Sequence, residues 1–227
     1  ICGLIAMTNI SSAVLLFSTC MVVLFIGRVP LKFIAMLLII GGVAGMIAFQ
    51  FGQRGGTAVS RIEAFFGDEI PYQAQQGYAA IATGGLFGKG PGQSDQRNFL
   101  PSAYSDFIYA IIIEEYGLVG GIIVIFLYLG LLYRGMKATT HSETAYGGLL
   151  VSGLVFSIIF QAMINIGVTL GLGPITGVTL PLLSMGGTSQ LFFGIAIGMI
   201  LSVTQGELSP YPIGVKGNQS KNFERVA

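Results

Sequence analysis

Long apolar stretches separated by short polar turns run through most of this chain. They cover residues 1–26, 33–51, 107–132, 149–172 and 188–204, and the polar group Thr8–Ser12 is expected to break the first of them. Residues 107–132 would form a helix about 39 Å long, which exceeds a hydrocarbon core of about 30 Å. We therefore predict an all-α polytopic membrane protein with five transmembrane helices in a single domain, residues 1–205.

Polar residues dominate two other parts of the chain. Residues 52–105 form a long loop with amphipathic pieces at Ser60–Phe66 and Tyr72–Ala82, which predicts short helices lying at the membrane interface. Loops of this length are usually functional or disordered. The tail, residues 206–227, is polar and is predicted to be disordered and cytoplasmic.

Composition narrows the function classes. The 227 residues are 53% hydrophobic and 9% charged, and the net charge of +1 argues against nucleic acid as a partner. If five spans alternate, seven basic residues fall on one side, which the positive-inside rule makes cytoplasmic. They are Arg28, Lys32, Arg134, Lys137, Lys216, Lys221 and Arg225. The long loop is then extracytoplasmic.

Three acids stand at the start of the third span. Asp106 is predicted in the first helical turn at the membrane surface, with Ser105 or Ser102 as the helix cap. Glu114 and Glu115 lie deeper, where a charge costs about 2.5 to 3.5 kcal/mol unless it is paired, protonated or in a polar cavity. A cavity shared with Asp106 can include at most one of these glutamates, because they point to different sides of one helix.

Two uncharged patterns admit more than one interpretation. Ser157, Gln161, Asn165 and Thr169 are four residues apart and form a polar stripe, which suits hydrogen bonding between helices as well as a substrate path. The segment that ends in Gly186-Gly187-Thr188-Ser189 is either an anion-attracting helix start or a tight re-entrant turn. No Cys/His cluster has metal-ligand spacing, and Cys2 and Cys20 are too far apart for a disulfide if they share one helix.

Three blocks in a fixed order indicate a family. They are GGLFGKG, FLPSAYSDFIYAIIIEEYGLVG and NIGVTLGLGPITGVTLPLLSMGGTS. They resemble motifs of the SEDS family, whose members FtsW and RodA are polytopic peptidoglycan glycosyltransferases of about ten spans. The similarity runs from about Leu4 to Gln205, so the chain resembles the C-terminal half of that fold. It looks more like the division type, FtsW, although division and elongation members share these motifs.

The resemblance implies roles for individual residues. Asp106 matches the family's essential acid and would be the catalytic general base. Lys89 would neutralise diphosphate. The remaining substrate-binding residues that the resemblance implies are Tyr72, Gln73, Gln76, Glu114, Ser184, Gly186, Gly187 and Ser189. For Glu114, substrate binding and a purely structural role both stay open. Ser102, Tyr104 and Met185 depart from the family pattern, so contacts near Asp106 are expected to differ.

The resemblance also implies partners and a location. The substrate would be lipid II, an undecaprenyl-diphosphate-linked disaccharide peptide, and the protein partner a class B penicillin-binding transpeptidase, both at the bacterial inner membrane or the division septum. The sequence requires no cofactor, although the family leaves Mg²⁺ or Mn²⁺ open. Two alternatives are a flippase for the lipid-linked precursor, with Glu114, Glu115 and the polar stripe as its path, and a non-catalytic scaffold for a transpeptidase.

Overall fold

The computed structural model describes residues 2–51, 60–61, 63, 65–67, 71–99, 104–142 and 144–206. Every regular element in these ranges is helical. The chain order is α1 (Cys2–Thr8), α2 (Ile10–Ile26), α3 (Leu31–Phe51), α5 (Tyr72–Gly84), the 3-10 turn η1 (Gln96–Asn98), α6 (Ile108–His141), α7 (Ala145–Thr169) and α8 (Gly187–Gly206). The predicted all-α membrane fold is confirmed. The predicted tail beyond Gly206 lies outside the described residues.

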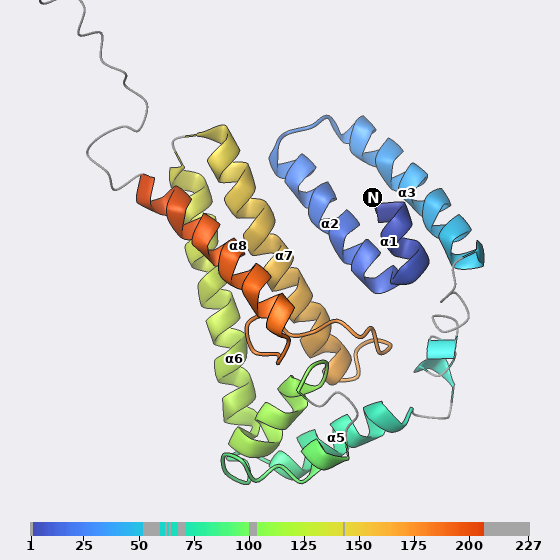
Figure 1. Cartoon of the computed structure of the whole chain (residues 1–227), viewed down its shortest axis with the longest axis vertical. Coiled ribbons are helices and arrows are strands. Elements are labelled where there is room, and N and C mark those ends of the chain that lie inside the picture. The colour runs from blue at the N-terminus through green and yellow to red at the C-terminus, as the bar shows by residue number, and fades with distance from the viewer. Residues whose placement is uncertain are drawn as a thin grey trace, which may run out of the picture.

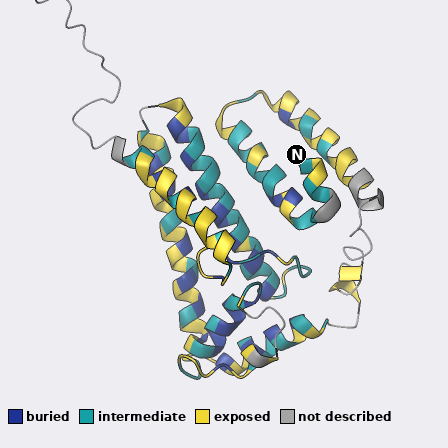
Figure 2. Cartoon of the chain, viewed as in Figure 1, coloured by how far each residue is buried: buried dark blue, intermediate teal, exposed yellow. Residues whose placement is uncertain are grey.

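Three of these helices are long and apolar enough to cross a membrane, namely Ile108–His141, Ala145–Thr169 and Gly187–Thr204. The apolar helices Ile10–Ile26 and Leu31–Met46 are shorter. Five spans therefore stay a prediction. Figure 2 shows many exposed residues along α3, α6 and α8. Many of them have large apolar side chains, as expected of helices that face lipid.

The first apolar stretch forms two helices. α1 ends at Thr8, and the Asn9 side chain caps α2 by accepting a hydrogen bond from the Ser12 backbone N–H at 3.3 Å. This agrees with the expected break. α1 packs against both α2 and α3 (Figure 1). Both cysteines, Cys2 and Cys20, are free thiols, although the assumption that they share one helix is wrong.

The core lies where α6 packs along α7. Tyr109, Ile113, Val151, Ile158 and Leu180 are among its buried residues, and α8 adds Ala196 and Ile200. α5 packs across the first turns of α6, at the end of the molecule opposite the α2–α3 turn and the α6–α7 connection (Figure 1). The basic residues Arg28, Lys32, Arg134 and Lys137 thus lie far from α5.

Candidate active site

Asp106 lies in the turn just before α6 and is half-buried. Its Oδ1 accepts a hydrogen bond from the Ser105 hydroxyl at 3.0 Å. Its Oδ2 faces Gly177, where a Cβ atom would stand 3.8 Å away. Phe107 is the N-cap of α6 and provides no side-chain capping bond, so the predicted cap by Ser105 is wrong. The alternative cap, Ser102, lies outside the described residues.

A buried amide from α7 holds the Asp106 backbone. Asn165 is 2% exposed, and its Nδ2 donates to the Asp106 carbonyl at 2.8 Å and to the Val178 carbonyl at 2.7 Å. Its Oδ1 has no hydrogen-bond partner among the described residues. One side chain therefore ties the Asp106 turn to the segment that follows α7, from Leu170 to Gly186.

A second tie comes from Ser184, which is also buried. Its hydroxyl donates to the Ser105 carbonyl at 2.6 Å and accepts from the Leu180 N–H at 2.8 Å. Beside it, the Met185 N–H donates to the Tyr104 carbonyl at 2.8 Å. These bonds fix the backbone on the N-terminal side of Asp106 without using its carboxylate.

The polar stripe of α7 faces the same segment. Gln161 donates from Nε2 to the Thr179 carbonyl at 3.0 Å, and the Thr169 hydroxyl donates to the Asn165 carbonyl at 2.8 Å. Three of the four stripe residues are thus engaged in hydrogen bonds within the protein. Their partners are the segment after α7, the Asp106 turn and the α7 backbone itself, so a structural role is better supported than a continuous substrate path, although none of these bonds joins two helices.

Glu114 is fully buried and organises the glycine-rich loop. Its carboxylate accepts from Lys89 Nζ at 2.8 Å and from the Ser94 hydroxyl at 2.5 Å. It also lies within 3.4 Å of three further donors, the Thr83 hydroxyl and the backbone N–H groups of residues 95 and 96. A buried carboxylate with this many donors is paired and hydrogen-bonded, as such a charge requires. We name these contacts the Glu114 cluster.

Glycines let the same loop approach the backbone of α6. Gly117 has φ 72° and ψ −174° and interrupts the helix, and a Cβ there would lie 2.2 Å from the Leu86 carbonyl oxygen. A Cβ at Gly84 or Gly88 would also lie within 2.2 Å of α6 backbone atoms. The backbone groups freed by the interruption bond to the loop instead, for example Lys89 N–H to the Glu114 carbonyl at 2.9 Å. GGLFGKG is therefore a docking motif for α6.

Lys89 links the Glu114 cluster to the exposed part of the glycine-rich loop. Its ammonium group pairs with Glu114 at 2.8 Å and with the exposed Asp95 at 2.9 Å. Hydrogen bonds from Glu114 and then Asp95 raise the pKa of Lys89 above its usual value of 10.5. The group is thus a cation at any physiological pH, with two carboxylates already beside it.

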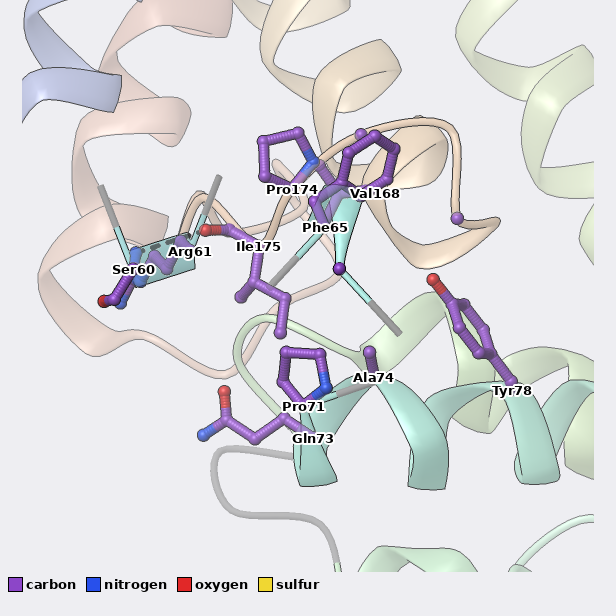
Figure 3. A pocket seen from close by; sticks show the side chains of 13 residues that line it. Ser60, Arg61, Phe65, Pro71, Gln73, Ala74, Tyr78, Val168, Pro174 and Ile175 are labelled. Carbon is purple, nitrogen blue, oxygen red and sulfur yellow. Dashed lines mark hydrogen bonds between the residues drawn. The ribbon is translucent and has the colours of Figure 1, made fainter. Parts of the chain in front are cut away.

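Two cavities flank the segment that faces Asp106. A cavity of about 580 Å³ lies between α5, the 60–67 stretch and residues 168–175, and its polar lining includes Arg61, Gln73 and Tyr78 (Figure 3). Arg61 Nη1 donates to the Ile175 carbonyl at 3.2 Å. A smaller cavity of about 270 Å³ is lined by Gly177, Gln161 and residues of α2. Residues 173–179 contribute to both.

The remaining predicted residues are spread over this end of the molecule. Tyr72, Gln73 and Gln76 start α5, and of these only Gln73 lines the larger cavity. Gly187 begins α8, with Gly186 before it and Ser189 in its first turn. The sequence reasoning did not single out Arg61, and it gave Ser94 no role. The position of Arg61 in the amphipathic piece Ser60–Phe66 was its only signal.

Across the described ranges, no group of three His, Cys, Asp or Glu side chains could hold a metal ion. A resident Mg²⁺ or Mn²⁺ therefore finds no ready ligand set in that part of the chain.

Several known proteins are similar to this chain in sequence, and a solved structure is similar to it in fold. Residues 1–208 match the family described as "Cell cycle protein", that of FtsW, RodA and SpoVE, and the chain belongs to this family. It is 35% identical over 203 residues to stage V sporulation protein E of Bacillus subtilis, covering 87% of this chain and 55% of that protein. It is 34% identical to the probable peptidoglycan glycosyltransferase FtsW of Bacillus subtilis, in a match that covers 100% of this chain and 61% of that protein.

A third relative, the peptidoglycan glycosyltransferase RodA of Treponema pallidum, is 40% identical over 135 residues, covering 59% of this chain and 31% of that protein. Among solved structures, a chain from a peptidoglycan synthase complex has a TM-score of 0.67 and 24% identity, covering 88% of this chain and 56% of that one. This chain thus spans little more than half the length of the first two relatives, and the solved structure shares its fold.

Proposed function

We propose that the protein carrying this chain is a peptidoglycan glycosyltransferase that polymerises lipid II into glycan strands. The family membership supports the proposal, as do the relatives named as glycosyltransferases of this kind. The observation that carries it is the Asp106 carboxylate. Asn165 holds the Asp106 carbonyl and Ser184 holds the carbonyl of the preceding residue, Ser105, while Asp106 itself stays half-exposed with its carboxylate beside Gly177.

In the proposed reaction, Asp106 is the general base. Its carboxylate accepts the proton of the acceptor sugar's 4-hydroxyl as that oxygen attacks the anomeric carbon of the donor. The new glycosidic bond forms while the bond to undecaprenyl diphosphate breaks, and the diphosphate leaves with the electron pair. Such a single displacement inverts the donor's α linkage to β. The fixed backbone keeps the carboxylate in one position for this proton transfer.

We further propose that the 580 Å³ cavity receives part of the lipid-linked substrate. It has a size typical of ligand pockets, and Arg61 brings a cation to a lining that also includes Gln73 and Tyr78. Arg61 suits a diphosphate because its planar guanidinium group presents several donors. Lys89 suits this role less well, since its ammonium group is already paired with Glu114 and Asp95. Its proposed role is to dock the loop.

The remaining elements of the proposal concern location and partners. We place the protein in the bacterial cytoplasmic membrane, with Asp106 on the extracytoplasmic side because the described basic turns lie at the other end of the helices. A class B penicillin-binding transpeptidase is the proposed partner. The septum is the proposed site of action if the protein is of the division type.

The test uses the purified full-length protein reconstituted with lipid II. Asp106→Asn should lower polymerisation by about 10²- to 10⁴-fold, because it removes the proton acceptor, while lipid II binding is kept. Glu115→Gln is the control, since no hydrogen bond or ion pair of its carboxylate occurs among the described residues. Unchanged polymerisation by Asp106→Asn would refute the general base. Headgroup translocation without polymerisation by the wild type would favour the flippase, and full viability of an Asp106→Ala strain would favour the scaffold.

A further inference from the structure

A second polar feature lies at the other end of α6, far from Asp106. A groove of about 660 Å³ opens between α6 and α8, with Val155 of α7 at its base. Its walls are apolar for most of their length, formed by Leu127, Leu131, Ile197, Ile200 and Leu201. At its end toward the α6–α7 connection, the lining becomes cationic.

Three basic side chains gather at that end. Arg134, Lys137 and His141 follow one another at spacings of three and four residues, so they share one face of α6. All three are exposed, and His141 Nδ1 is held against the Lys137 carbonyl at 2.9 Å. Thr204 of α8 completes the polar end of the lining.

No acid within the described ranges neutralises Arg134 or Lys137. Every described acid lies between Glu63 and Glu115, on the loop or at the start of α6. Glu115 is about 28 Å along the helix from Arg134. Neither Arg134 nor Lys137 forms an ion pair among the described residues. The groove thus combines a long apolar wall with a positive end that no described acid pairs.

Gly130 keeps the groove open. It lies in the lining, and a Cβ at that position would meet nothing within 4 Å. Gly135 in the same lining has no room for a side chain, because a Cβ there would lie 2.4 Å from Val155 Cγ2. A larger side chain at 130 would therefore occupy groove space without disturbing the contact between α6 and α7.

We propose that this groove binds an anionic diacyl phospholipid from the leaflet at that end of the helices. Basic pockets between transmembrane helices bind lipid head groups with a negative phosphate, and the apolar wall would receive an acyl chain. The volume falls in the range of ordinary ligand pockets. Charge complementarity favours a lipid over a neutral helix as the occupant. The site is independent of the glycosyltransferase proposal, since it lies at the opposite end of α6 from Asp106.

The test is native mass spectrometry of the full-length protein titrated with phosphatidylglycerol and with phosphatidylcholine. Phosphatidylglycerol should bind more tightly, and Arg134→Gln/Lys137→Gln should weaken its binding by about 25-fold, at roughly fivefold per cation. Gly130→Leu should also weaken binding while leaving every charge in place. Lys32→Gln is the matched control, because Lys32 is exposed near the same end of the helices but lies outside the groove.

Several results would overturn the proposal. Equal binding of the two lipids would remove the role of charge, and wild-type affinity in both groove variants would move the site elsewhere. Competition by millimolar inorganic phosphate, with Gly130→Leu unaffected, would show a site for a soluble anion. A photocrosslink from position 130 to another protein segment, in place of lipid, would show that a helix fills the groove.

Discussion

Substituting Glu114 by Gln should release the glycine-rich loop from α6. Glutamine keeps the size of the side chain and one acceptor oxygen, but it removes the charge and replaces the other oxygen with an NH₂ donor. The site was built for an acceptor, since five donors surround the buried carboxylate of the Glu114 cluster. Lys89 can turn toward solvent and Asp95, because its side chain is 28% exposed.

The magnitude follows from the lost charge-assisted hydrogen bonds. A hydrogen bond to a charged group contributes about 1.5 to 3 kcal/mol. Glu114→Gln should therefore destabilise the docked loop by about this amount, because the lost charge lies at a fully buried position. A free-energy change of about 1.4 kcal/mol changes an equilibrium constant tenfold. Local opening of residues 85–98 should therefore become about 10- to 150-fold more frequent. Amide hydrogen exchange of peptides covering this loop, followed by mass spectrometry, measures that opening directly.

Glu115→Gln is the matched control, because it makes the same chemical change one residue later, where only the backbone carbonyl of Glu115 is used by the loop. Its exchange should stay at the wild-type rate. The double variant Glu114→Gln/Lys89→Met should open less than the sum of the two single variants, because both remove the same interaction. Wild-type exchange in Glu114→Gln, or an equal increase in Glu115→Gln, would refute the role of the cluster.

Three further predictions concern other positions. Asn165→Leu should lower the free energy of unfolding by about 1 to 3 kcal/mol and reduce polymerisation, because the carbonyl oxygens of Asp106 and Val178 lose their donor. Ser157→Ala, on the same stripe, should change neither the stability nor the polymerisation. Gly117→Ala should abolish loop docking or folding, as judged by thermal unfolding and yield, because its backbone conformation is essentially restricted to glycine; Gly130→Ala should be neutral or slightly stabilising. Asn9→Ala should cost about 1 kcal/mol of stability in denaturant titration, and Asn9→Ser should restore it.

Much of the helical layout could be predicted from hydropathy alone. The expected span 149–172 corresponds to α7 at 145–169, and the expected span 188–204 to α8 at 187–206. This succeeds because a long apolar stretch has few alternatives to a helix in lipid. α6 starts at Ile108, one residue after the expected start of the span, and Asp106 lies in the turn before the helix instead of in its first turn, because no side-chain cap marks the helix start.

The site was less accessible to sequence reasoning, since its contacts join distant positions. Asn165 reaches the Asp106 backbone across 59 residues, and Lys89 reaches Glu114 across 25. A polar stripe and a glycine-rich turn are visible in the sequence, but each suits several partners. The positive φ of Gly117 leaves no mark beyond a glycine, so the docking of GGLFGKG onto an interrupted helix could not be predicted.

In the proposed reaction, the Asp106 carboxylate takes the proton of the acceptor's 4-hydroxyl. The decisive measurement is a structure of the full-length protein with a bound acceptor sugar, which gives the distance from the nearer Asp106 carboxylate oxygen to that hydroxyl oxygen. We expect about 2.6 to 3.2 Å, or one bridging water. An acceptor bound with its 4-hydroxyl beyond reach of Asp106, and beside another base, would rule out Asp106 as the general base.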